Sequence, residues 1–190
     1  MKTKSWIVSI TVMAGLFAAE AQAHVGVHGV GLAAGMMHPF SGLDHLLAMI
    51  AVGAWAAQQG GRARWAVPLA FVAMMVAGGA WGGLGNWLPG IESGIAASVL
   101  VLGLLIAFSA RLPLAAGMAL AGAFALFHGY AHGAEMPAIA NAWLYALGFV
   151  LSTALLHAAG LGAGLAIKAG LMRLGGAGLA FAGMWMLAGF

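Results

Sequence analysis

Residues 137–160 read PAIANAWLYALGFVLSTALLHAAG, a long apolar stretch without Asp, Glu, Lys or Arg. A membrane-spanning helix needs about 20 consecutive, mostly apolar residues, and this stretch meets the requirement. Five other stretches do so as well, while alternating patterns of about 10 residues, typical of membrane β-strands, do not occur. We therefore predict an all-α, polytopic membrane bundle with six membrane-spanning helices, over residues 28–59, 65–86, 91–110, 112–133, 137–160 and 171–190.

The composition points the same way. Of the 190 residues, 64% are hydrophobic and 6% are charged, whereas soluble domains have about 45–50% and about 25%. The 31 glycines suit close helix packing in lipid, and the absence of cysteine excludes disulfides and cysteine-bound metals. The seven Lys and Arg residues form no clustered basic face, so we expect no nucleic-acid partner.

The first 23 residues have the features of a secretory signal peptide. Lys2 and Lys4 precede an apolar stretch, and Ala21-Gln22-Ala23 matches an A-x-A cleavage site. We predict a signal peptide over residues 1–23 and a single six-span domain over residues 24–190. The alternative is an uncleaved first membrane helix.

The basic residues predict the orientation in a bacterial inner membrane. With the mature N-terminus on the periplasmic side, alternation places every remaining basic residue on the cytoplasmic side, as the positive-inside rule requires. These residues are Arg62, Arg64, Arg111, Lys168 and Arg173. An even number of spans also places the C-terminus on the periplasmic side.

Two short runs hold most of the remaining ionisable residues: HPFSGLDH at 38–45 and HGYAHGAE at 128–135. Both His45 and His128 lie 17 residues from a predicted cytoplasmic arginine, which is about 26 Å along a helix. Because ionisable groups within lipid normally face a bundle interior or a wet path, we expect the two runs to meet in the outer half of the bundle.

Local geometry supports this convergence. His128, His132 and Glu135 share one helical face through their i, i+4, i+7 spacing. The first span is too long for one straight helix, and we predict a break near Pro39 and Gly42. The residue before a proline avoids the helical region, so His38 should end an unwound stretch and Pro39 should open the next helix.

The donor set predicts a site for a divalent transition metal. Asp44 and His45 should lie in the early turns of the helix that follows the break. Imidazole and carboxylate ligands without thiolate suit nickel, cobalt, zinc or copper(II), and calcium and magnesium less well. The predicted metal-handling residues are His38, Asp44, His45, His128, His132 and Glu135. The alternative is a set of polar residues that hydrogen-bond one another to link helices.

Three further histidines are weaker candidates. His157 falls near mid-membrane, either as a deeper step for the ion or as a buried histidine bonded to Ser152 or Thr153. His24 and His28 could collect metal at the entrance, although the sequence favours the alternative, a solvated chain end.

At the two polar runs, the sequence resembles the HupE/UreJ family of nickel transporters. The matching stretches are HPFSGLDHLLAMIAVG (38–53), FHGYAHGAEMP (127–137) and LLHAAG (155–160). The resemblance implies nickel, or cobalt as in some relatives, as the transported ion. It also implies a functional link to hydrogenase or urease, the nickel enzymes that members of the family serve.

We therefore predict a transporter for Ni²⁺ or Co²⁺, not an enzyme, with the ion as substrate and no cofactor. No G-x-x-x-x-G-K-[ST] loop occurs, so transport should be facilitated or coupled to an ion gradient. The alternative is an intramembrane zinc-dependent hydrolase whose metal-bound water attacks lipid amides or esters. The choice of metal, the energy coupling and the oligomeric state are open at this point.

Overall fold

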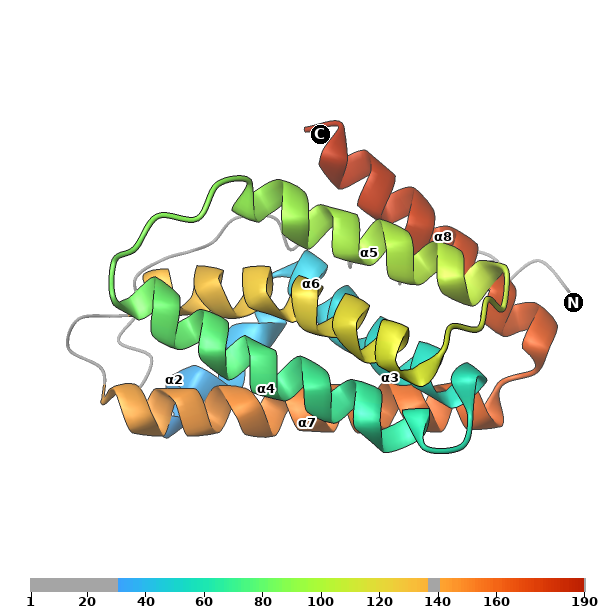
Figure 1. Cartoon of the computed structure of the whole chain (residues 1–190), viewed down its shortest axis with the longest axis horizontal. Helices are drawn as coiled ribbons and strands as arrows, with labels where there is room; N and C mark the ends of the chain where they lie inside the picture. The colour runs from blue at the N-terminus through green and yellow to red at the C-terminus, as the bar shows by residue number, and fades with distance from the viewer. Residues whose placement is uncertain (1–30, 137–140, 190) are drawn as a thin grey trace, which may run out of the picture.

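The computed structural model describes residues 31–136 and 141–189, and its regular structure in these ranges is entirely helical (Figure 1). The predicted all-α class is therefore confirmed. The helices, in order, are α2 (Leu32–Met37), the 3-10 helix η1 (His38–Phe40), α3 (Leu43–Gln59), α4 (Ala63–Gly83), α5 (Ile91–Ala107), α6 (Leu114–Ala134), α7 (Ala142–Ala166) and α8 (Ala169–Leu187).

The helices support a multi-pass membrane protein. Four of those described, α4, α6, α7 and α8, are long and apolar enough to cross a membrane. A fifth span results if α2, η1 and α3 form one broken span, whereas α5 is a shorter apolar helix of 17 residues. Six spans therefore stay a prediction. The signal segment 1–23, His24 and His28 lie outside the described residues.

The predicted break in the first span is confirmed, but the expected unwinding at His38 and the expected helix start at Pro39 are wrong. The axes of the two halves, Leu32–Phe40 and Leu43–Gln59, differ by 85°. His38 is helical, with φ −60° and ψ −43°, and Pro39 lies inside η1 rather than opening the long helix. The chain instead turns extended at Gly42, with φ −115° and ψ 124°. The steric restriction before proline is only a preference, and His38 adopts the helical conformation despite it, directly before the tight 3-10 turn.

Glycines bring the helices into backbone contact. A Cβ atom on Gly129 or Gly133 of α6 would overlap the backbone of α4, and one on Gly53 of α3 would overlap the carbonyl group of His157 on α7. Glycines similarly line the contacts of α2 with α7 and of α5 with α8. This close approach is typical of helices that pack in lipid, where small residues line the interfaces.

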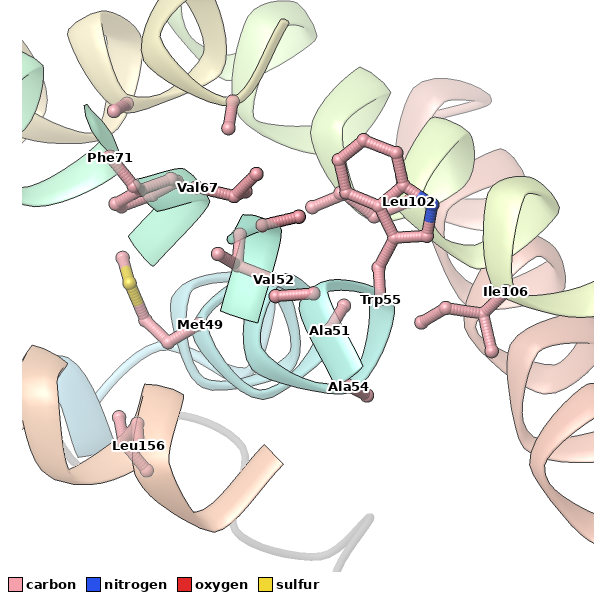
Figure 2. Close-up of a cluster of buried hydrophobic side chains, with 14 of the residues drawn as sticks. Met49, Ala51, Val52, Ala54, Trp55, Val67, Phe71, Leu102, Ile106 and Leu156 are labelled. Carbon is pink, nitrogen blue, oxygen red and sulfur yellow. The ribbon is translucent and has the colours of Figure 1, made fainter. Parts of the chain in front are cut away.

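An apolar core fills the interior beside α3 (Figure 2). The close-up shows Met49, Val52 and Trp55 of α3 among apolar side chains from α4, α5 and α7. Phe71 of α4 is also fully buried in this cluster.

The connections at one end of the bundle are tied together by side chains. Trp55 Nε1 donates to the carbonyl oxygen of Ala110 at 3.0 Å, and Gln59 makes two hydrogen bonds with the backbone of Leu112. Arg173 Nε donates to the carbonyl oxygen of Ala107 at 2.9 Å. The α3–α4, α5–α6 and α7–α8 connections thus share one end, as Figure 1 shows. All five basic residues of the described chain belong to these connections or to the helix turns next to them.

Candidate metal centre

The two polar runs meet inside the bundle, as the sequence predicts. The ring centroids of His38 and His132 are 4.6 Å apart, those of His45 and His132 are 4.3 Å apart, and those of His45 and His128 are 4.8 Å apart. η1 supplies His38, the first turn of α3 supplies His45, and one face of α6 supplies the other two. Four imidazoles from two remote stretches therefore form one continuous cluster.

The glycines next to the histidines explain how α6 presents this face. His128 and His132 are each followed by a glycine, Gly129 and Gly133, whose missing side chains let α6 lie directly against α4. Residues at i and i+4 share a face, so this contact fixes the rotation of α6 and directs both imidazoles inward. His128 is fully buried and His132 is 5% exposed.

Three residues of the cluster bring their donor atoms close enough together that they could hold one metal ion. Ligand atoms of His38, His132 and Glu135 all lie within 4.8 Å of one another. His38 Nε2 and Glu135 Oε2 form an ion pair at 3.4 Å, and the side chain of Glu135 is 60% exposed. The hydrogen bond from His38 holds the pKa of Glu135 below its ordinary value, although partial burial opposes this. An ionised carboxylate thus lies at the accessible edge of the cluster.

Asp44 contacts the cluster through His45. Its Oδ1 atom accepts hydrogen bonds from the backbone N–H of His45 at 2.7 Å and from Nδ1 of the same residue at 2.8 Å. Nδ1 of His45 therefore carries the proton, and Nε2 keeps the lone pair that a metal requires. A carboxylate that orients a ligating imidazole is a common partner of metal sites.

Buried imidazole nitrogens without a hydrogen-bond partner are the main electrostatic feature of the site. Within the described ranges these atoms are His45 Nε2, His128 Nδ1, and both ring nitrogens of His132 and His157. Leaving a buried polar atom unsatisfied costs about 1–3 kcal/mol. A bound cation that accepts these lone pairs would remove that cost.

His157 lies apart from the four clustered imidazoles. The ring of Phe71 packs against His157 and also against His128, with its centroid 5.1 Å from the first ring and 5.8 Å from the second. The alternative interpretation of His157, a hydrogen bond to Ser152 or Thr153, is wrong. Ser152 donates to the carbonyl oxygen of Met36 and Thr153 to the sulfur of Met75.

Three residues of the site were missed by the sequence analysis. Ser98 of α5 lies 2.8 Å from Nε2 of His128, and Phe149 of α7 packs its ring 4.0 Å from that of His132. The hydroxyl group of Tyr145 is buried without a partner in the described part of the chain. A serine or tyrosine inside an otherwise apolar span could have identified Ser98 and Tyr145 from the sequence. No sequence feature distinguishes Phe149 from the other apolar residues of its span.

An apolar cavity lies beside the cluster. It has a volume of about 310 Å³ and is lined by residues of α4, α6 and α7, including His132, Met136, Tyr145 and Phe149. Met136 therefore borders a space that reaches a clustered imidazole.

Fold and site together define an all-helical, multi-pass membrane protein with a buried histidine–carboxylate cluster. The chain belongs to the HupE/UreJ family: the model of this family, described as HupE / UreJ protein, matches residues 11–186. It is also similar to Protein HupE of Rhizobium leguminosarum bv. viciae, with 49% identity over 173 residues that cover 89% of this chain and 91% of the relative. No solved structure matches the chain.

Proposed function

We propose that the protein takes up Ni²⁺, or Co²⁺, across the bacterial inner membrane as a secondary transporter or facilitator. Membership in the HupE/UreJ family supports a role related to nickel or cobalt transport. The observation that carries the mechanism is the convergence of four imidazoles and two carboxylates from remote parts of the chain.

In the proposed mechanism, the hydrated ion first meets the exposed edge of the cluster. The carboxylate of Glu135 attracts the cation, and His38 and His132 replace part of its water shell. The rings of His45 and His128 follow next in the cluster. Each offers a buried nitrogen that has no partner in the described parts of the chain. Borderline divalent ions bind imidazole and carboxylate donors well, which fits nickel and cobalt.

His157 is the proposed next step for the ion. Its two nitrogens are buried without partners in the described structure, and the ring of Phe71 contacts both His157 and His128. The core beside α3 toward the end that carries the basic residues includes large apolar side chains, among them Trp55 and Ile106 (Figure 2).

The proposed orientation places the His38–Glu135 edge toward the periplasm and the basic connections toward the cytoplasm. The separation of the basic connections from Glu92 and Glu135 supports it, because basic residues are enriched in cytoplasmic loops. Both chain termini would then be periplasmic. The family also suggests that the delivered ion supports nickel enzymes, hydrogenase or urease.

The alternative function, an intramembrane zinc-dependent hydrolase, gains no support from the family assignment. A hydrolytic zinc site keeps one coordination position for water and needs a base beside it. Here the Asp44 oxygen that faces the cluster is bonded to His45.

Uptake of radioactive nickel into cells that lack their own importers tests the proposal. We expect His45→Ala, His128→Ala and Glu135→Gln to abolish most uptake at equal expression, because each removes a donor from the cluster. Glu92→Gln is the matched control, since it neutralises an exposed carboxylate in the first turn of α5, outside the cluster. Unchanged uptake in the first three variants would refute the proposed site.

A further inference from the structure

We propose that Ser98 is a positioning residue that fixes the tautomer of His128, so that Nδ1 of this imidazole faces the transported ion. The inference rests on the proposed function, and it assigns a role to a helix, α5, that contributes none of the predicted ligands. Ser98 and His128 are both completely buried.

The single hydroxyl proton of Ser98 decides which ring nitrogen of His128 is protonated. The hydroxyl group of Ser98 lies 2.6 Å from the carbonyl oxygen of Ile95 and 2.8 Å from Nε2 of His128. A carbonyl oxygen can only accept, so the single hydroxyl proton is donated to Ile95. The Ser98 oxygen must then accept from His128, which places the imidazole proton on Nε2.

The consequence is a free lone pair on the other nitrogen. Nδ1 of His128 is buried and has no hydrogen-bond partner in the described parts of the chain. The rings of His45 and His128 are neighbours in the cluster, with centroids 4.8 Å apart, and Asp44 Oδ1 accepts a hydrogen bond from Nδ1–H of His45, so the proton of that ring is also fixed by a partner. Each of these two neighbouring imidazoles is thus hydrogen-bonded to a partner through one ring nitrogen and offers the lone pair of the other.

A purely structural role for Ser98 makes a different prediction. Serine within a helix often donates to a backbone carbonyl group of the preceding turn, and this contact alone would explain its burial. In that case the tautomer of His128 would not depend on the hydroxyl group. The contact between α5 and α6 would matter only for packing.

The test uses the full-length protein labelled with ¹⁵N in its histidine rings, because NMR distinguishes a protonated ring nitrogen from one with a free lone pair. We expect His128 of the wild type, without metal, to carry its proton on Nε2. Ser98→Ala should shift His128 toward the other tautomer and weaken nickel binding about 10- to 100-fold, as loss of an outer partner of a metal ligand typically does. Ser98→Thr, which keeps a hydroxyl group, should restore both properties.

Ser152→Ala is the matched control. Ser152 is also buried and also donates to a backbone carbonyl group at 2.6 Å, but its partner is Met36 and no imidazole. This variant should leave the tautomer of His128 unchanged. A wild-type His128 protonated on Nδ1 would overturn the inference even if Ser98→Ala failed to fold, and so would an unchanged tautomer in a folded Ser98→Ala protein.

The NMR result separates this inference from the proposed function. If Ser98→Ala changes the tautomer but no variant, including the wild type, binds or transports nickel, then Ser98 positions His128 and the proposed substrate is wrong. If nickel uptake depends on His128 while its tautomer ignores Ser98, the proposed function holds and this inference fails.

Discussion

The imidazoles of His45 and His128 each have one nitrogen bonded to a neighbour and the other buried without a partner among the described residues. Such an arrangement has a cost in the empty protein, because buried polar atoms without partners are unfavourable. It also prepares the site, since neither ring must turn or change tautomer before a cation binds. At the scale of single residues, the partners of the ligands therefore matter as much as the ligands.

Asp44 gives the first prediction at this scale. Asp44→Ala removes the acceptor for Nδ1–H of His45, and we expect nickel affinity to fall about 10- to 100-fold. Asp44→Asn can still accept this hydrogen bond through its carbonyl oxygen but lacks the charge, so its affinity should lie between that of Asp44→Ala and that of the wild type. Titration of nickel into purified protein measures both. Equal affinity of Asp44→Ala and the wild type would show that Asp44 does not orient His45.

The pH dependence of uptake gives the second prediction. Only neutral imidazole binds a metal ion, and histidine in water ordinarily titrates at about pH 6.5. The pKa of Glu135 is held below its ordinary value, so this carboxylate stays charged in mildly acidic medium and does not account for a loss there.

Initial uptake rates at constant free nickel should therefore fall on acidification, because protonation of an imidazole removes the lone pair that binds the ion. An ionophore that removes the proton gradient separates this effect from any change in driving force. Rates that rise on acidification after this treatment would contradict competition between protons and the ion.

At the scale of elements, the break after η1 places the Asp44–His45 pair. Gly42 is extended, a conformation open to alanine, yet a Cβ atom there would lie 2.7 Å from Asp44 Oδ1 and 3.1 Å from His45 Nδ1. We expect Gly42→Ala to displace this pair and to lower nickel affinity several-fold, with little change in helical content by circular dichroism. An affinity equal to that of the wild type would show that the pair has room to adapt.

The α4–α6 contact gives a prediction about stability. A Cβ atom on Gly129 would overlap the carbonyl group of Met75, so Gly129→Ala must push the two helices apart. Overpacking of this kind typically costs about 1–3 kcal/mol. Thermal unfolding of the purified protein should therefore begin at a lower temperature.

Gly162→Ala is the matched control for Gly129→Ala. Gly162 also lies within a helix, but no neighbouring atom in the described structure lies within 4 Å of the position that its Cβ atom would take. Its Tm should equal or exceed that of the wild type, because alanine is the better helix former. A Gly129→Ala protein as stable as this control would mean that α4 and α6 separate without penalty.

The elements differ in how far the sequence predicted them. Uninterrupted apolar stretches predicted α4 to α8 to within several residues, because the length of a span follows from the thickness of the membrane. The convergence of the two polar runs was also predictable, since charged and polar groups avoid lipid. Other features depend on how the helices pack, which no local sequence pattern encodes. They are the conformation of His38, the contacts of Phe71 with His128 and His157, and the contact of Ser98 with His128.

At the scale of the whole molecule, the charges divide between the two ends. The basic residues lie at the α3–α4, α5–α6 and α7–α8 connections, while Glu92 and Glu135 adjoin the connections at the other end. The chain has no cysteine, so a single introduced cysteine reports its own exposure.

We expect a membrane-impermeant maleimide to label Ser93→Cys, at the start of α5, in intact cells. Ser109→Cys, between α5 and α6, should react only after the cells are broken. The reverse pattern would place the basic connections outside and would overturn the proposed orientation.

The glycine contacts divide the bundle into pairs of helices that share backbone surfaces, among them α4 with α6 and α3 with α7. His128 and His132 belong to the first pair, whereas His45 belongs to the second. A cargo ion coordinated from both sides would add a further link between these two units. The two equilibria are thermodynamically linked. If the ion stabilises the contact between the two units by a given free energy, its own binding weakens by the same free energy when the units separate.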